Sequence, residues 1–194
     1  MKTNSIRANF FGGSGIWVYA KLLQQHGMFL PRKFFITSGK GESGTSLNAF
    51  DMALMAAHID QCNIVQVSSI LPPDAIQLKN PIPVITPGTI TFAVLARMDG
   101  QYGETIGAGV AWAFGDRDNG VNFGIVAEDH GFKSKESVER SLSDKLDEMA
   151  RVRMLKITEK SIQAESIEVK ENNGCVIVAL IYVPWEIEEG CRIL

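Results

Sequence analysis

The order of strand-like and helix-like segments constrains the fold of this chain more than any other feature. Apolar segments of strand length alternate with only two segments of helical periodicity. The order is strand, helix, four strands, helix and two strands, and it is typical of helices packed on the outside of sheets. We therefore predict an α/β fold with layered sheets and helices. The strands are expected at residues 34–37, 63–70, 89–98, 106–114, 121–128, 161–170 and 175–183.

The connections carry their own signals. Residues 38–44 are rich in glycine and read as a flexible loop. Residues 71–87 contain five prolines and must form an irregular connection. The last two strands flank Asn172-Asn173-Gly174, which predicts a terminal hairpin.

Each helix has an expected N-cap and an expected buried face. Thr45 or Ser46 can cap the first helix, and Ser134 can cap a second helix that runs to about Arg153. The charged face of the second helix, Lys145 included, reads as solvated. Residues at helical spacing are expected to face the core: Leu47, Phe50, Leu54 and Ala57 in the first helix, and Val138, Leu142, Leu146 and Met149 in the second.

Composition narrows the class of protein. The 194 residues carry a formal net charge of −3, which disfavours nucleic-acid binding, and no segment approaches the length of a membrane span. Three cysteines without metal-ligand spacing argue against a disulfide framework or a zinc site, so we expect reduced thiols and a cytoplasmic protein. Residues 1–30 read as an appendage to one domain, 31–194.

The run from Gln66 to Pro73 is the first candidate for chemistry. An apolar strand ends at Ser68-Ser69, and Pro72-Pro73 breaks the chain just beyond. A peptide bond held from both sides can store strain, and a serine hydroxyl there can attack the preceding carbonyl. A polar strand end with a Pro-Pro stop is the commoner meaning of such a run.

Three more polar residues stand out, each with an ordinary alternative. Asp51 lies between apolar helix neighbours and is either a counter-charge for a cationic ligand or a carboxylate that reaches water or pairs with His58. Glu128 ends an apolar strand, where partial burial would raise its pKa; otherwise it is solvated. Asn63 starts the strand before the serines and could stabilise an oxyanion, or simply begin a strand after a turn. Because neighbours on a strand point apart, Glu128-Asp129-His130 is not expected to bind metal.

These residues occur within blocks that resemble the pyruvoyl-dependent arginine decarboxylases over about residues 30–183. The order of the blocks carries the resemblance. They are Gly41-Glu42 with Leu47-Asn48-Ala49-Phe50-Asp51, Asn63-Ile64-Val65, Ser68-Ser69-Ile70-Leu71-Pro72-Pro73, Gly103-Glu104-Thr105-Ile106, Gly124-Ile125-Val126-Ala127-Glu128 and Gly174-Cys175.

The resemblance implies a self-cleaving enzyme. Cleavage between Ser68 and Ser69 would give a β chain, residues 1–68, and an α chain, residues 69–194, that begins with a pyruvoyl group made from Ser69. That covalent group would serve in place of pyridoxal phosphate, and no metal is implied. The implied fold is a four-layer αββα sandwich, assembled as trimers or paired trimers with active sites between subunits.

The resemblance also implies roles for single residues. Asn63 would assist cleavage, and Glu128 would donate a proton during decarboxylation of arginine to agmatine. Asp51 would meet the guanidinium of the substrate, with Leu47 and Leu54 beside it. Glu104 matches the family without an assigned role. Two alternatives stay open: decarboxylation of another cationic amino acid, and an unprocessed relative that serves as a binding or assembly protein.

Overall fold

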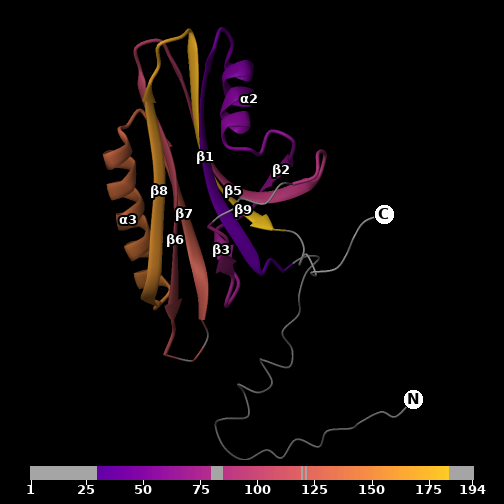
Figure 1. The fold of residues 1–194 in the computed structure, drawn as a ribbon. Coiled ribbons are helices and arrows are strands. Elements are labelled where there is room, and N and C mark those ends of the chain that lie inside the picture. The colour runs from indigo at the N-terminus through magenta and orange to yellow at the C-terminus, as the bar shows by residue number, and fades with distance from the viewer. Residues whose placement is uncertain (1–29, 80–84, 119, 121, 184–194) are drawn as a thin grey trace, which may run out of the picture. The chain divides into compact units, whose positions relative to one another are not determined.

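The computed structural model describes residues 30–79, 85–118, 120 and 122–183. Two β-sheets pack face to face, and one helix covers the outer face of each, in the order helix, sheet, sheet, helix (Figure 1). The predicted four-layer sandwich is confirmed. The helices are α2 (Ser46–Ala56) and α3 (Lys135–Val152). In spatial order, the five-stranded sheet contains β2 (Asn63–Gln66), β5 (Ile90–Gln101), β9 (Asn173–Val183), β1 (Lys33–Ser43) and β4 (Ile76–Gln77). The four-stranded sheet contains β3 (Ile70–Leu71), β7 (Asn122–Gly131), β6 (Thr105–Asp116) and β8 (Lys156–Glu168).

Both helices begin where their capping residues predict. The hydroxyl of Thr45 accepts a hydrogen bond from the backbone of Asn48, and Ser134 caps α3 in the same way. The stripe predicted for α3 is buried at Val138, Leu142 and Leu146, with Ala150 completing it and Met149 partly buried.

The buried face predicted for α2 is partly wrong. The residues of this helix that are fully buried are Ala49 and Ala53, whereas Leu47 is 73% exposed. Phe50 and Leu54 are only partly buried against the same cluster, which Ala57 joins after the helix ends. The helix rests on its smallest side chains because it lies very close to β1.

The glycine-rich segment 38–44 is not a flexible loop, because β1 continues through it to Ser43. A Cβ atom on Gly39 would lie 1.9 Å from the carbonyl oxygen of Ala53, and one on Gly41 would lie 2.2 Å from that of Ala49. The glycines therefore let the backbone of α2 approach the strand. Sequence alone made this close approach look like flexibility.

Two predicted strand arrangements are also wrong. Residues 156–168 and 173–183 do not form a hairpin, because β8 pairs with β6 while β9 lies between β5 and β1 in the other sheet. The strand predicted at 63–70 is divided: β2 belongs to the five-stranded sheet and β3 to the four-stranded sheet. The chain therefore passes from one sheet to the other at the serine pair.

Aromatic side chains fill the space between the sheets. The rings of Phe34 on β1 and Trp112 on β6 meet edge to face, with centroids 5.7 Å apart. Tyr182 on β9 is buried in the described part of the chain. No helix in the described ranges is long and apolar enough to cross a membrane. The thiols of Cys62 and Cys175 are free.

Candidate functional site

Hydrogen bonds to both sheets hold the serine pair. Upstream, the Val67 amide donates to the Ala93 carbonyl of the five-stranded sheet (3.0 Å). Downstream, the Ser69 carbonyl accepts from the Val126 amide of the four-stranded sheet (2.9 Å). Between them, the Ile70 amide donates to the carbonyl of Ser68 (3.2 Å). The peptide bond between the serines is thus the place where the chain crosses the sandwich.

Hydrogen bonds constrain this bond, and no left-handed backbone angle accompanies them. Neither serine is among the described residues with positive φ, which are His58, Asp74 and Met154 apart from glycines. The strain expected from the sequence is therefore absent at the level of φ. What holds the bond is its attachment to two separate sheets.

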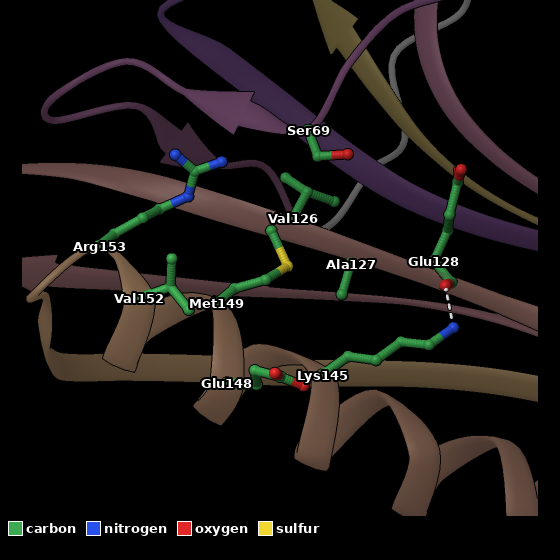
Figure 2. Close-up of a pocket in the computed structure, with 9 residues that line it drawn as sticks. All are labelled: Ser69, Val126, Ala127, Glu128, Lys145, Glu148, Met149, Val152 and Arg153. Carbon is green, nitrogen blue, oxygen red and sulfur yellow. Dashed lines mark hydrogen bonds between the residues drawn. The ribbon is translucent and has the colours of Figure 1, made fainter.

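A pocket of about 430 Å³ opens beside Ser69. One wall is β7, with Val126, Ala127 and Glu128, and the other is the C-terminal half of α3 with Arg153, which caps its end (Figure 2). From the helix, apolar side chains and charged groups both reach the pocket: Lys145, Glu148, Met149 and Val152. The structure thus brings Ser69 and Glu128 together, as the resemblance implies.

The register of β3 and β7 explains this meeting. Ile70 pairs with Ile125, which places Ser69 opposite Val126 and on the same face of the sheet. Glu128 lies two residues farther along β7 and projects from that face (Figure 2). Its side chain is exposed in the single chain, so the expected partial burial is not observed there.

Lys145 ties α3 to the strand that carries Glu128. Its Nζ donates to the backbone carbonyl of Glu128 (2.8 Å) and to Oδ1 of Asp129 (2.7 Å), while Lys133 holds Oδ2 (2.8 Å). Burial by itself would raise the pKa of Asp129, but hydrogen bonds from Lys133 and Lys145 outweigh it and lower that pKa. Lys145 is exposed, as its position on the charged face of α3 predicts, but no spacing along the chain reveals these long-range contacts.

Asp51, Leu47 and Leu54 do not reach the pocket of their own chain. They lie on α2, which covers the outer face of the other sheet (Figure 1). Asp51 and Leu47 are exposed there, and Leu54 is partly buried. In the single chain, the Asp51 carboxylate is in contact with solvent, which is one of the alternatives expected from the sequence.

Asn63 is also away from the serines. Its side-chain amide donates to the carbonyl of Gly88 (2.8 Å) at the start of β2. Ser68 lies five positions farther along the chain, which is about 16 Å in extended backbone. Within the described residues, no group of three or more His, Cys, Asp or Glu side chains could hold a metal ion.

Comparisons with known proteins agree on one family. The family model for pyruvoyl-dependent arginine decarboxylase matches residues 33–186. A protein of that name from Methanopyrus kandleri is 36% identical over 79% of this chain and 97% of its own length. A second from Methanothermobacter thermautotrophicus is 35% identical over 80% of this chain and 99% of its own. A probable member from Chlorobium phaeovibrioides is 39% identical over 56% of this chain and 60% of its own.

Proposed function

Because this chain belongs to the pyruvoyl-dependent arginine decarboxylases, we propose that it cleaves itself between Ser68 and Ser69 and then decarboxylates L-arginine to agmatine and CO2. The observation that carries this proposal is the position of the serine pair, where the chain crosses between sheets beside a pocket shared with Glu128. The Ser69 side chain is only half-buried, so its hydroxyl has room to react.

Self-cleavage needs no group from outside the chain except water. The hydroxyl oxygen of Ser69 attacks the carbonyl carbon of Ser68, and the C–N bond breaks as the nitrogen takes up a proton, which leaves an ester. Loss of the Cα proton of residue 69 and of the Ser68 carboxylate then gives a dehydroalanine. Its imine tautomer is hydrolysed to a ketone and ammonia.

The residues present fit a pyruvoyl group at position 69. The Ser69 carbonyl becomes the amide carbonyl of the new group, and the Val126 amide already holds that oxygen. Residues 70 and 71 remain anchored in β3 after the break. The ketone supplies an electron-withdrawing carbonyl for decarboxylation, as a bound cofactor does in other decarboxylases.

Glu128 is the proton donor in this proposal. Glu128 projects from the same face of the sheet as Ser69. Its carboxyl group would therefore lie on the side of the pocket where the Cα atom of the substrate binds. Its side chain is exposed in the single chain, so a neighbouring subunit would have to complete the enclosure that favours the protonated acid.

The substrate-binding residues come, in this proposal, from a neighbouring subunit of a trimer or of paired trimers. Asp51 would pair bidentately with the guanidinium, and Leu47 and Leu54 would contact the aliphatic part of the substrate. Asn63 would assist cleavage, the role that the family resemblance implies. Exposed apolar side chains on α2 and along the β2 edge support such a contact: Leu47, Met52, Met55, Val65 and Val67.

Intact mass and an arginine assay test the proposal together. Purified protein should contain two fragments in place of one 21.3 kDa chain, and the larger should resist N-terminal sequencing. It should release CO2 from arginine, while Ser69→Ala should remain one chain with no activity. A Ser69→Ala protein that still yields two chains would refute the proposed cleavage.

The same measurements separate the alternatives. A processed protein that releases CO2 from lysine or histidine but not from arginine would be a pyruvoyl enzyme of different specificity. An intact, inactive wild-type chain under these conditions would support a binding or assembly protein. The cytoplasmic location stays a prediction.

A further inference from the structure

Tyr182 connects the two sheets next to the serine pair. It belongs to β9 in the five-stranded sheet, yet its hydroxyl donates to the carbonyl of Ile70 in the four-stranded sheet (2.9 Å). The side chain is only 3% exposed. Burial raises the pKa of the phenol to about 12, so the hydroxyl keeps its proton and stays a donor at ordinary pH.

Ile70 is thereby held on both of its peptide units. The Val126 amide binds the Ser69 carbonyl, which is part of the peptide unit before Ile70, and Tyr182 binds the carbonyl of the unit after it. The Ile70 amide N–H cannot rotate freely while both contacts last. It points at the Ser68 carbonyl oxygen, 3.2 Å away, in a hydrogen bond between residues two apart that is typical of a γ-turn.

We propose that the Ile70 amide is the oxyanion donor for self-cleavage at Ser68–Ser69, and that Tyr182 is the residue that positions it. This inference rests on the proposed function, since it describes the first step of that cleavage. It assigns the donor to the chain's own backbone, in contrast to Asn63, whose side-chain amide is engaged by Gly88.

The chemistry requires a donor at this place. As the Ser69 hydroxyl oxygen bonds to the Ser68 carbonyl carbon, the carbonyl π electrons move to oxygen and negative charge develops there. When the C–N bond breaks, the electron pair on that oxygen re-forms the carbonyl, and the nitrogen leaves with the proton that the Ser69 hydroxyl gave up. A donor fixed in advance stabilises the charged intermediate without reorganisation. The Ile70 N–H already occupies this position in the uncleaved chain.

Tyr182→Phe tests the positioning role because it removes one hydroxyl and keeps the buried ring. The full-length chain is made by cell-free translation, and its conversion into residues 1–68 and 69–194 is followed on denaturing gels. We expect conversion that reaches completion with a rate constant about tenfold lower, as one lost hydrogen bond implies. Tyr102→Phe is the matched control, because that side chain is 75% exposed and should convert at the wild-type rate.

The final extent of conversion distinguishes a positioning defect from a folding defect. A partly misfolded variant leaves a fraction that never converts, whereas a poorly positioned amide slows every molecule equally. Excess hydroxylamine isolates the first step, because it cleaves each ester as it forms and makes the acyl shift limit the rate. The Tyr182→Phe defect must persist in hydroxylamine. A defect that disappears there would lie in elimination and would overturn the assignment.

Ile70→Pro tests the donor, because proline has no amide hydrogen. We expect conversion in hydroxylamine to slow by about 100-fold, the usual effect of removing one oxyanion donor. Ile70→Val keeps the N–H and is the matched control. Should the proline disturb β3, residue 70 is replaced by its α-hydroxy acid analogue, which lacks the N–H. Conversion of that chain is followed without hydroxylamine, because hydroxylamine would also cleave the new backbone ester, and conversion at the wild-type rate overturns the proposal. A wild-type chain that never converts would instead refute the proposed function itself.

Discussion

At the scale of single residues, the site is decided by which atoms the strand register places opposite one another. Ser69 lies across from Val126, and Glu128 follows on the same face two residues later. A shift of one residue in this pairing would place Ser69 opposite a β7 residue that faces α3, while β6 would keep Glu128 where it is. The proposed chemistry therefore depends on the register of a two-residue strand, β3.

Glu128→Gln should separate cleavage from decarboxylation. The amide cannot act as a general acid, so we expect normal conversion to two chains and CO2 release from arginine lowered by about 100-fold to 10,000-fold. Glu148→Gln is the control, because Glu148 lines the same pocket from α3 and has no assigned role. Equal activity in the two variants would remove Glu128 from the mechanism.

At the scale of elements, the close contact between α2 and β1 sets where Asp51 is displayed. The helix can approach the strand because Gly39 and Gly41 have no side chains in its path. This leaves the opposite face of α2 exposed, with Asp51 and Leu47 on it. The glycines thus contribute to the site by placing a helix.

Gly39→Ala should destabilise the protein, because its Cβ would overlap the Ala53 carbonyl and force α2 away from β1. We expect a loss of about 3 kcal/mol in the free energy of unfolding. Gly44→Ala is the matched control: a Cβ there meets nothing within 4 Å, and the change should stay within about 0.5 kcal/mol. Urea denaturation at one protein concentration measures both, and equal midpoints would contradict the close-contact explanation.

The ion pairs that join α3 to β7 predict a dependence of stability on pH. Because the pKa of Asp129 is lower in the folded chain than in the unfolded chain, its contribution is complete above the unfolded pKa of about 3.9. The contribution is lost as the pH falls through the folded value. Asp129→Asn should therefore cost about 1–3 kcal/mol at pH 7 and progressively less in acid.

Asp118→Asn is the control for this experiment. Asp118 forms an ion pair with Lys156, but both side chains are largely exposed, so little change in stability is expected at any pH. Chemical denaturation at several pH values measures both variants. An Asp129→Asn effect that does not shrink below pH 4 would show that the carboxylate is not what stabilises this contact.

At the scale of the whole molecule, the single chain holds only part of the proposed site. Ser69 and Glu128 share one pocket, whereas Asp51 lies beyond the other sheet. The β2 edge and the exposed face of α2 present apolar side chains that a neighbouring copy would cover. Assembly would then complete the site as well as stabilise the chain.

Complementation between variants tests this arrangement. Asp51→Ala and Glu128→Gln should each be nearly inactive alone. If each site draws Asp51 from one chain and Glu128 from its neighbour, a random one-to-one mixture made by co-expression should regain about a quarter of wild-type activity. Activity no greater than that of the two variants prepared separately would place both residues in one chain, or would deny them their roles.

The sequence alone accounts for most of the helices and strands, because their formation follows from local chemistry. Thr45 and Ser134 cap helices with their own hydroxyls, and the spacing of Val138, Leu142 and Leu146 defines a buried stripe wherever α3 lies. The order of the sequence blocks pointed to the family and to the serine pair. These features depend on neighbours within a few residues, which a linear chain displays directly.

Only the tertiary structure decided which strands pair and what each glycine does. An apolar strand fits either sheet, so nothing local separates β8 from β9 or divides residues 63–70 between two sheets. Gly39 looks the same in a loop as under a helix, and nothing near Lys145 in the sequence reveals its hydrogen bond to β7. The serine pair follows the same rule: its presence is readable from the sequence, but the hydrogen bonds that hold Ser69 and Ile70 come from partners as distant as Val126 and Tyr182.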